Sequence, residues 1–224
     1  FVFSLNYLFP GDALSNMTGI QNISYDEYIN LAVEYRIEQN VFSQYAAFVG
    51  RIVQGNWGVS FITGTSIYDQ VFSVLPATIE LASYALLYSF IVAIPFGILA
   101  SNENHPILDK CILAASIIGF SMPIFWLALL LILVFSINLG WFPISGRLSL
   151  VYDIPQQTGF LLFDILNSDV SYKYEAFKDA LRHLVIPTFV LATYPTTVLI
   201  RTTRQSMKEV LNTSYIKAAK AKGL

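Results

Sequence analysis

The stretch from Cys111 to Ile137 contains no charged residue. As an α-helix rising about 1.5 Å per residue it would be about 40 Å long, more than the ~30 Å hydrocarbon core of a bilayer. So long and uniformly apolar a run is not typical of a helix buried in a soluble domain. The sequence therefore predicts a membrane-spanning helix over 111–137, with room to tilt or bend.

Two further stretches have the same character. Ile79 to Ala100 carries a single ionisable residue, Glu80, and the shorter run Leu184 to Ile200 carries none. Charged residues make up 12% of the chain, against roughly 25% in ordinary soluble domains. Alternating strand patterns of the outer-membrane type do not occur. We therefore expect an all-α polytopic membrane protein with further spanning helices over 79–100 and 184–203.

The distribution of basic residues predicts an orientation. Six of them crowd the last part of the chain: Arg201, Arg204, Lys208, Lys217, Lys220 and Lys222. Such an excess marks the cytoplasmic side, so segment 204–224 is expected there. Counting back, the link 101–110 is also cytoplasmic, and segments 10–78 and 138–183 lie outside. Residues 1–9, apolar but too short to span, are interpreted as the end of a first transmembrane helix.

Two short amphipathic helices are predicted in the first outer segment. Ser24 and Glu27 have the spacing of a capping box, and a second apolar stripe from Val41 to Ile52 is followed by Gly55, a helix-stop residue. These helices either contact a substrate or only cover the membrane-embedded part. The pattern leaves both interpretations open.

No residue pattern predicts catalysis or a cofactor. The phosphate-binding motif G-x-x-x-x-G-K-[ST] is missing from the sequence, Cys111 is the only cysteine, and neither His105 nor His183 has a metal-ligand neighbour. We expect no catalytic, metal or cofactor site, and no ATP hydrolysis by this chain alone. Glu80 and His183 are expected at membrane boundaries, the first at a helix entrance and the second in solvent.

Prolines predict kinks in all three spans, at Pro95, Pro123, Pro187 and Pro195. Polar, flexible and aromatic side chains gather around Pro123, which makes this the candidate lining of a translocation pathway. The candidate residues are Ser121, Met122, Pro123, Phe125 and Trp126. Ordinary packing between helices accounts for the same residues equally well.

The last part of the chain is predicted to form an amphipathic helix. Its apolar residues follow a 3.6-residue period: Met207, Val210, Leu211, Ser214, Tyr215 and Ala218. A basic amphipathic helix beside a membrane either lies on anionic lipid or docks into a groove on a partner. The small residues Ala218, Ala219, Ala221 and Gly223 favour docking, because they allow close approach but contribute little to lipid insertion.

Segment Tyr215–Leu224, YIKAAKAKGL, resembles the E-A-A-x-x-x-G coupling motif of ABC importer permeases, in the Y-x-x-x-A-x-A-K-G-L form of peptide importers. Lys217 stands where the general motif has Glu. Other landmarks of that family follow in order: Pro10-Gly11-Asp12, Gly55-x-x-Gly58-x-Ser60, Leu75-Pro76-x-Thr78, Leu139-Gly140-Trp141-x-Pro143-x-Ser145-Gly146, His183-Leu184-x-x-Pro187 and Arg201-x-x-Arg204-x-Ser206-Met207.

The resemblance is nearest to the first permease of dipeptide and oligopeptide importers, particularly the Sap type associated with antimicrobial peptides and polyamines. It implies a type I ABC importer permease fold in the bacterial inner membrane, of which this chain lacks the start of the first helix and the last two helices. It also implies three kinds of protein partner besides the lipid bilayer, and no nucleic acid: a second permease, two cytoplasmic ATPases, and an outer, periplasmic substrate-binding protein.

Site residues follow from the same resemblance. The residues expected to contact the ATPase are Tyr215, Ile216, Ala218, Ala219, Lys222, Gly223 and Leu224, and Arg201 and Arg204 mark the inner end of the preceding helix. The alternative function is a secondary transporter of peptides or amines driven by an ion gradient. It predicts acids or histidines in mid-membrane. A membrane scaffold would explain the docking helix but not the ordered landmarks.

Overall fold

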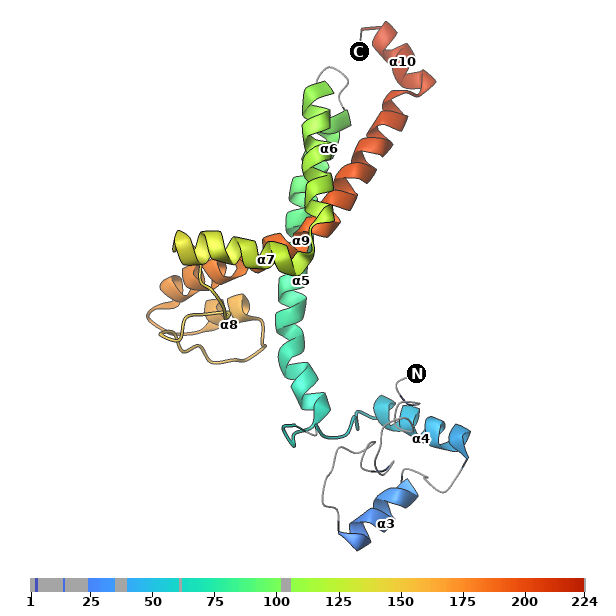
Figure 1. Ribbon diagram of the computed structural model, residues 1–224, viewed down its shortest axis with the longest axis vertical. Helices are drawn as coiled ribbons and strands as arrows, with labels where there is room; N and C mark the ends of the chain where they lie inside the picture. The colour runs from blue at the N-terminus through green and yellow to red at the C-terminus, as the bar shows by residue number, and fades with distance from the viewer. Residues whose placement is uncertain are drawn as a thin grey trace. The chain divides into compact units, whose positions relative to one another are not determined.

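The computed structural model describes residues 3, 14, 24–34, 40–60, 62–101 and 106–223. The regular secondary structure of these residues is helical, and their one β pairing is an isolated bridge between Val59 and Ser66. The chain divides into two compact units, Phe1–Leu75 and Pro76–Leu224 (Figure 1). The expected all-α class is confirmed. Of the predicted segment 1–9, only Phe3 lies within the described residues, and Pro10–Asp12 lie outside them.

The first unit contains α3 (Tyr25–Glu34) and α4 (Val41–Val53). Ser24 Oγ accepts a hydrogen bond from the Glu27 amide at 3.3 Å, the contact that the capping-box spacing predicts. Asn40 caps α4 by accepting from the Ser43 amide at 2.8 Å. Just after α4, Gly55 adopts a φ of 84°, a left-handed conformation that turns the chain away from the helix axis.

A cluster of aromatic side chains holds the start of α5 (Ile67–Ser101) within this unit. The ring of Tyr68 lies 4.3 Å from that of Phe72 and 5.5 Å from that of Trp57, centroid to centroid. The Trp57 indole nitrogen donates to the carbonyl of Ile52 at 2.9 Å. The aromatic rings thus connect the end of α4 to the first turns of α5.

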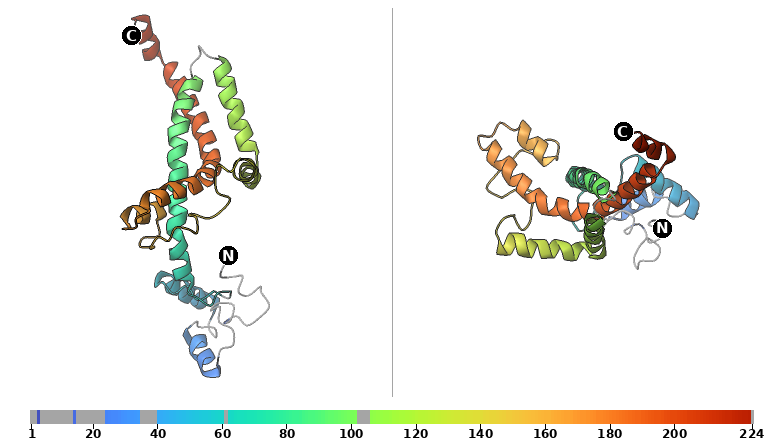
Figure 2. Two further views of the ribbon diagram at one scale, coloured as in Figure 1. Left: turned by 90° about the vertical axis from the view of Figure 1, so that its left-hand side faces the viewer. Right: turned by 90° about the horizontal axis from the view of Figure 1, so that it is seen from above.

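In the second unit, α5, α6 (Pro106–Ser121) and the last half of α9 (Lys173–Leu211) run beside one another (Figures 1 and 2). Small residues bring them close together: a Cβ atom added to Gly97 of α5 would lie 2.6 Å from Thr203 Cβ of α9. Thr197 of α9 donates to the Ser116 carbonyl of α6 at 3.3 Å. Close approach through small and hydroxylated residues is how helices associate in membranes.

A complete break interrupts the helix predicted over 111–137. Helix α6 ends at Ser121, and α7 (Ile124–Leu131) begins after Pro123, whose ψ of 130° is not helical. The axes on either side of the break differ in direction by 102°. The chain continues from α7 into a π-helix, η1 (Ile132–Asn138). The kink predicted at Pro123 is therefore a complete break between two helices, because the proline nitrogen cannot donate and its φ and ψ turn the chain.

The other three predicted kinks lie within continuous helices. Pro95 is inside α5, and Pro187 and Pro195 are inside α9. Helix α9 nevertheless changes direction along its length, as Figure 2 shows. Helices α5 and α9 are each long and apolar enough to cross a bilayer, and the bent pair Asp109–Ser121 and Ile124–Asn138 makes a third crossing if it is taken as one span.

The segment between η1 and α9 folds back on the first half of α9 and carries the short helix α8 (Leu161–Asn167) (Figure 1). The apolar core between this segment and α9 consists of Ile154, Leu162 and Ile165 from the segment and Ala176 and Ala180 from α9. The final helix, α10 (Ser214–Ala221), is separated from α9 by two residues. The helical stripe predicted from Met207 to Ala218 is therefore shared between two helices.

Candidate coupling and pathway sites

Helix α10 presents most of the predicted ATPase-contacting residues to solvent. Tyr215 is 67% exposed, and Ala218, Lys222 and Gly223 are also exposed. Ile216 and Ala219 are half-buried, one turn apart on the same face of the helix. Gly223 has a φ of 86°, which ends the helix in a left-handed residue. Leu224 lies outside the described residues.

The junction between α9 and α10 is formed by side chains that bond back to the end of α9. Asn212 Nδ2 donates to the Lys208 carbonyl at 3.0 Å, and Thr213 Oγ1 donates to the Val210 carbonyl at 2.7 Å. The same two carbonyls also accept the backbone amides of Asn212 and Thr213, at 3.2 and 3.1 Å, so these bonds close the end of the helix. The Thr213 carbonyl then accepts from the Lys217 amide at 3.1 Å, within the first turn of α10. The sequence-based helix did not include this junction.

The first turn of α6 and the last turns of α9 are joined by ion pairs to one carboxylate, Asp109 of α6. Arg204 approaches it with two nitrogens, Nε to Oδ1 at 2.6 Å and Nη2 to Oδ2 at 2.6 Å, and Lys208 Nζ lies 3.2 Å from Oδ2. The side chain of Asp109 is 16% exposed and that of Arg204 24%. Two parallel bonds from one guanidinium fix both distance and orientation. The sequence analysis selected Arg204 but missed Asp109, which lies 95 residues away.

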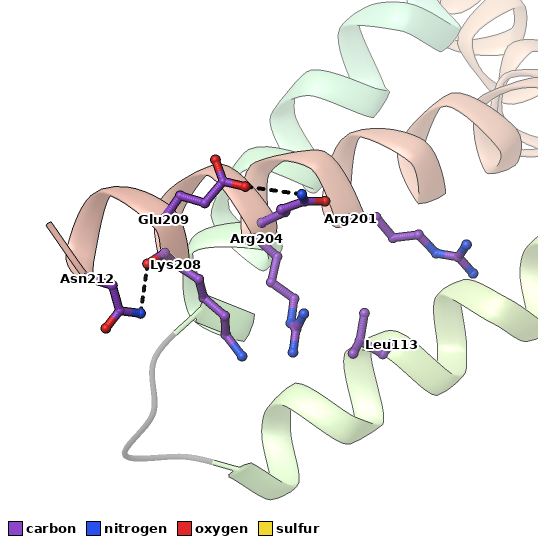
Figure 3. Close-up of a pocket in the computed structure, with 7 residues that line it drawn as sticks. Leu113, Arg201, Arg204, Lys208, Glu209 and Asn212 are labelled. Atoms are coloured by element: carbon purple, nitrogen blue, oxygen red, sulfur yellow. Dashed lines mark hydrogen bonds between the residues drawn. The ribbon is translucent and has the colours of Figure 1, made fainter.

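These basic side chains line a pocket of about 580 Å³ between α9 and Leu113 of α6. Figure 3 shows the side chains of Arg204 and Lys208 pointing from α9 toward α6, and that of Glu209, which also lines the pocket, leaving α9 in another direction. Glu209 accepts a hydrogen bond from Gln205 at 3.1 Å. The Arg201 guanidinium lies 5.8 Å from the centroid of the Phe120 ring, a cation–π distance. Both predicted inner-end arginines therefore contact α6.

The five candidate pathway residues surround the break between α6 and α7. Ser121, Pro123, Phe125 and Trp126 are exposed and Met122 is half-buried. Ser121 Oγ donates to the Ile117 carbonyl of its own helix at 2.8 Å, and Pro123 accepts at its carbonyl from the Trp126 amide at 3.0 Å. The break thus exposes aromatic side chains beside a bend. Exposure is compatible with a pathway and equally with a surface that another helix covers.

Glu80 is not at a helix entrance, because α5 begins at Ile67. It is 6% exposed, and its carboxylate accepts from Arg147 Nη2 at 2.7 Å and from the amides of Leu161 and Leu162 at 3.2 and 3.0 Å. Arg147 also donates to the Gly159 carbonyl at 3.0 Å. Glu80 therefore holds the segment around α8 against α5. No residue spacing in the sequence predicts the contact of Glu80 with Arg147.

His183 is likewise not in solvent, because α9 begins at Lys173 and continues past it. It is 8% exposed, and its Nδ1 lies 2.9 Å from the Asp179 carbonyl oxygen. The Asp179 carboxylate accepts from the amide and hydroxyl of Ser149 at 2.8 and 3.0 Å. His183 also borders an apolar pocket of about 410 Å³ between α5, α7 and α9. The expectation of a solvated interfacial histidine was wrong.

Asp164 organises the turn before α8. It is 3% exposed and accepts hydrogen bonds from the amides of Gln157, Thr158 and Gly159 and from the Thr158 hydroxyl. Burial opposes ionisation, yet these bonds, led by those from Thr158, hold the pKa of Asp164 below its usual value.

The described residues contain no group of three or more His, Cys, Asp or Glu that could bind a metal ion.

Comparison with known proteins identifies the family. Residues 93–224 match the family described as "Binding-protein-dependent transport system inner membrane component". The di/tripeptide transport system permease protein DppB of Pseudomonas aeruginosa (strain UCBPP-PA14) is 39% identical over 222 residues, covering 99% of this chain and 65% of that protein.

Two relatives from Escherichia coli (strain K12) are also similar. The putrescine export system permease protein SapB is 43% identical over 173 residues, covering 77% of this chain and 54% of that protein. The dipeptide transport system permease protein DppB is 34% identical over 227 residues, covering 99% of this chain and 66% of that protein. The chain thus spans between about half and two thirds of the length of these curated relatives. It belongs to the family of binding-protein-dependent transport system inner membrane components.

Proposed function

We propose that this chain is part of a membrane-spanning permease subunit of an ATP-driven importer that moves peptides across the bacterial inner membrane. The observation that carries the proposal is α10: a short, exposed helix with the peptide-importer form of the coupling motif, at the end of a helix long enough to cross a bilayer. A helix in this position is suited to transmit the movement of a soluble partner to the membrane helices.

Helix α10 docks on a cytoplasmic ATPase through its exposed face. Tyr215 supplies an aromatic anchor, and the adjacent small side chain of Ala218 lets the partner's surface approach the backbone. Ile216 and Ala219 are half-buried in this chain, so they support the helix from within more than they fill a partner's groove. Lys222 and Gly223 lie at its exposed end, and Gly223 sets the direction in which the chain leaves the helix.

The topology follows the positive-inside rule. Segment 204–224 and the link 101–110 are cytoplasmic, segments 10–78 and 138–183 are periplasmic, and the crossings lie in 79–100, 111–137 and 184–203. The exposed aromatic side chains at the break after Ser121 line the translocation pathway. The substrate-binding protein docks on the periplasmic side, and a second permease completes the membrane domain. ATP is hydrolysed by two separate ATPase subunits.

The substrate class is proposed from the relatives' names. Two of them are named for dipeptide or di/tripeptide transport, and a third for putrescine export. A peptide is the substrate that most of these names support. Cationic antimicrobial peptides and polyamines are the other substrates to test. The same measurements give the direction of transport.

The test is reconstitution of the full-length subunit with its second permease, ATPases and binding protein in proteoliposomes. Uptake of a labelled dipeptide is followed with ATP or an imposed proton gradient as the only energy source, and unlabelled cationic peptide or putrescine is added as competitor. We expect uptake that requires both ATP and the binding protein. Uptake on the gradient alone would overturn the proposal.

The alternative, a transporter driven by an ion gradient, gains support from one observation. Glu80 and His183 are buried titratable groups within helices α5 and α9, as such a transporter requires. Both are already bonded within the chain, Glu80 to Arg147 and His183 to the Asp179 carbonyl. Their bonds favour a structural role, and the gradient arm of the same experiment decides between the two functions.

A further inference from the structure

We infer that Asp109 is a positioning residue for coupling: by binding Arg204 and Lys208 it makes the inner ends of α6 and α9 move together, so that displacement of α10 reaches the break after Ser121. This inference rests on the proposed function, in which α10 receives the movement of the ATPase. In this arrangement α10 contacts the ATPase. The ion pairs of Asp109 are then the first contact through which its movement passes to the membrane helices.

The geometry of the contact supports this role. Arg204 holds both oxygens of Asp109 at 2.6 Å, and Lys208, one turn closer to α10, adds a bond at 3.2 Å. A bidentate pair resists sliding and rotation, whereas a single long bond does not. Among the described residues, these are the ion pairs that join α6 to α9. They lie on the face of α9 that points toward α6 in Figure 3.

The link from α10 to this contact is short. Lys208 is in the last turn of α9, and its carbonyl accepts from the side chain and the amide of Asn212, the first residue of the two-residue junction. Movement of α10 therefore pulls on the same turn that holds Asp109. A longer or unbonded linker would absorb that movement instead.

The link from Asp109 to the break runs along α6. Asp109 lies in the first turn of α6, and the helix ends at Ser121, where the chain turns through 102° into α7. The rest of the interface is made of neutral contacts, such as the Thr197 hydroxyl on the Ser116 carbonyl and the close approach of Gly119 to Thr193. Neutral, small-residue contacts let helices slide more easily than a bidentate ion pair does.

The experiment measures coupling, not only activity. Complete transporters containing the full-length subunit are reconstituted, and peptide uptake and phosphate release are measured in the same vesicles, together with co-purification of the ATPases. The variants are Asp109→Asn, which removes the charge, and the exchange Asp109→Arg with Arg204→Asp, which reverses the pair. Glu209→Gln is the control, because it removes a carboxylate of α9 that accepts its hydrogen bond from Gln205 of the same helix.

We expect Asp109→Asn to retain its ATPases but to transport about tenfold less peptide per ATP hydrolysed, a size typical of coupling between sites. The exchanged pair should recover a large part of the loss, and Glu209→Gln should keep the wild-type ratio. Wild-type coupling in Asp109→Asn, loss of its ATPases, or no recovery in the exchanged pair would each overturn the inference. Wild-type protein without ATP-dependent uptake would instead overturn the proposed function.

Discussion

At the scale of single residues, the carboxylates Glu80, Asp109 and Asp164 decide how distant segments meet. Each is held by donors: Glu80 by Arg147 and two amides, Asp109 by two cations, and Asp164 by a turn of backbone amides. Glu80 and Asp109 have their partners 67 and 95 residues away in the chain. No local spacing rule reports such a contact, so the sequence predicted neither of them.

Replacing Glu80 with glutamine should destabilise the second unit. Glutamine keeps one acceptor oxygen but loses the charge that Arg147 and the α8 amides require, and we expect a loss of about 1–3 kcal/mol in the free energy of unfolding. Thermal unfolding of the purified subunit in detergent measures it as a lower midpoint. Glu175→Gln, at an exposed position of α9, is the control and should leave the midpoint unchanged. Equal midpoints for both variants would contradict the role of Glu80.

Asp164 should make stability depend on acid pH. Its pKa is held below the ordinary value in the folded state, so its contribution is complete above the unfolded pKa of about 4 and is lost as pH falls through the lower, folded pKa. We expect Asp164→Asn to lower the unfolding midpoint at pH 7, and the difference from wild type to shrink below about pH 4. Asp169→Asn, at an exposed loop position, serves as the control. A pH-independent difference would contradict this assignment.

At the scale of helices, local chemistry predicted some boundaries and tertiary contacts decided others. Pro123 marks the break because its nitrogen cannot donate, and that signal is visible in the sequence. Helix α5 extends back to Ile67, and α9 back to Lys173, through polar residues that hydropathy excludes from a span. Those turns are held by contacts such as the packing of Trp57 on Tyr68 at the start of α5 and the bond from the Ser149 amide to Asp179 near the start of α9, which require the folded chain.

The packing of α5 against α9 depends on Gly97. An added Cβ would lie 2.6 Å from Thr203 Cβ and 3.1 Å from the Ile200 carbonyl oxygen, so Gly97→Ala should force the helices apart and cost about 1–3 kcal/mol in unfolding free energy. Gly50→Ala in α4 is the matched control, since nothing lies within 4 Å of its added Cβ and alanine favours the helix. A fall in the thermal midpoint for Gly97→Ala alone supports this packing, and no fall would contradict it.

At the scale of the whole molecule, the sequence predicted the family, the helical class and the surface character of α10, and it missed the polar contacts that hold the helices together. Tyr215 is exposed, and the residues three and four positions further along α10, Ala218 and Ala219, are small. Arg201 and Arg204 were recognisable from their motif. Their contacts with Phe120 and Asp109 were not, since these depend on how α6 lies beside α9.

The proposed topology places the two ends of the long helix α9 on opposite sides of the membrane, which makes a labelling prediction. Tyr174, 77% exposed near the first end, and Tyr215, just beyond the last, are each replaced by cysteine after the exposed Cys111 is changed to alanine. A membrane-impermeant maleimide should label Tyr174→Cys in spheroplasts and Tyr215→Cys only in inside-out vesicles. Adding the ATPases should protect Tyr215→Cys, because docking covers α10, and leave Tyr174→Cys reactive. Labelling of both positions from one side would refute the topology, and unprotected Tyr215→Cys in an assembled complex would refute docking through α10.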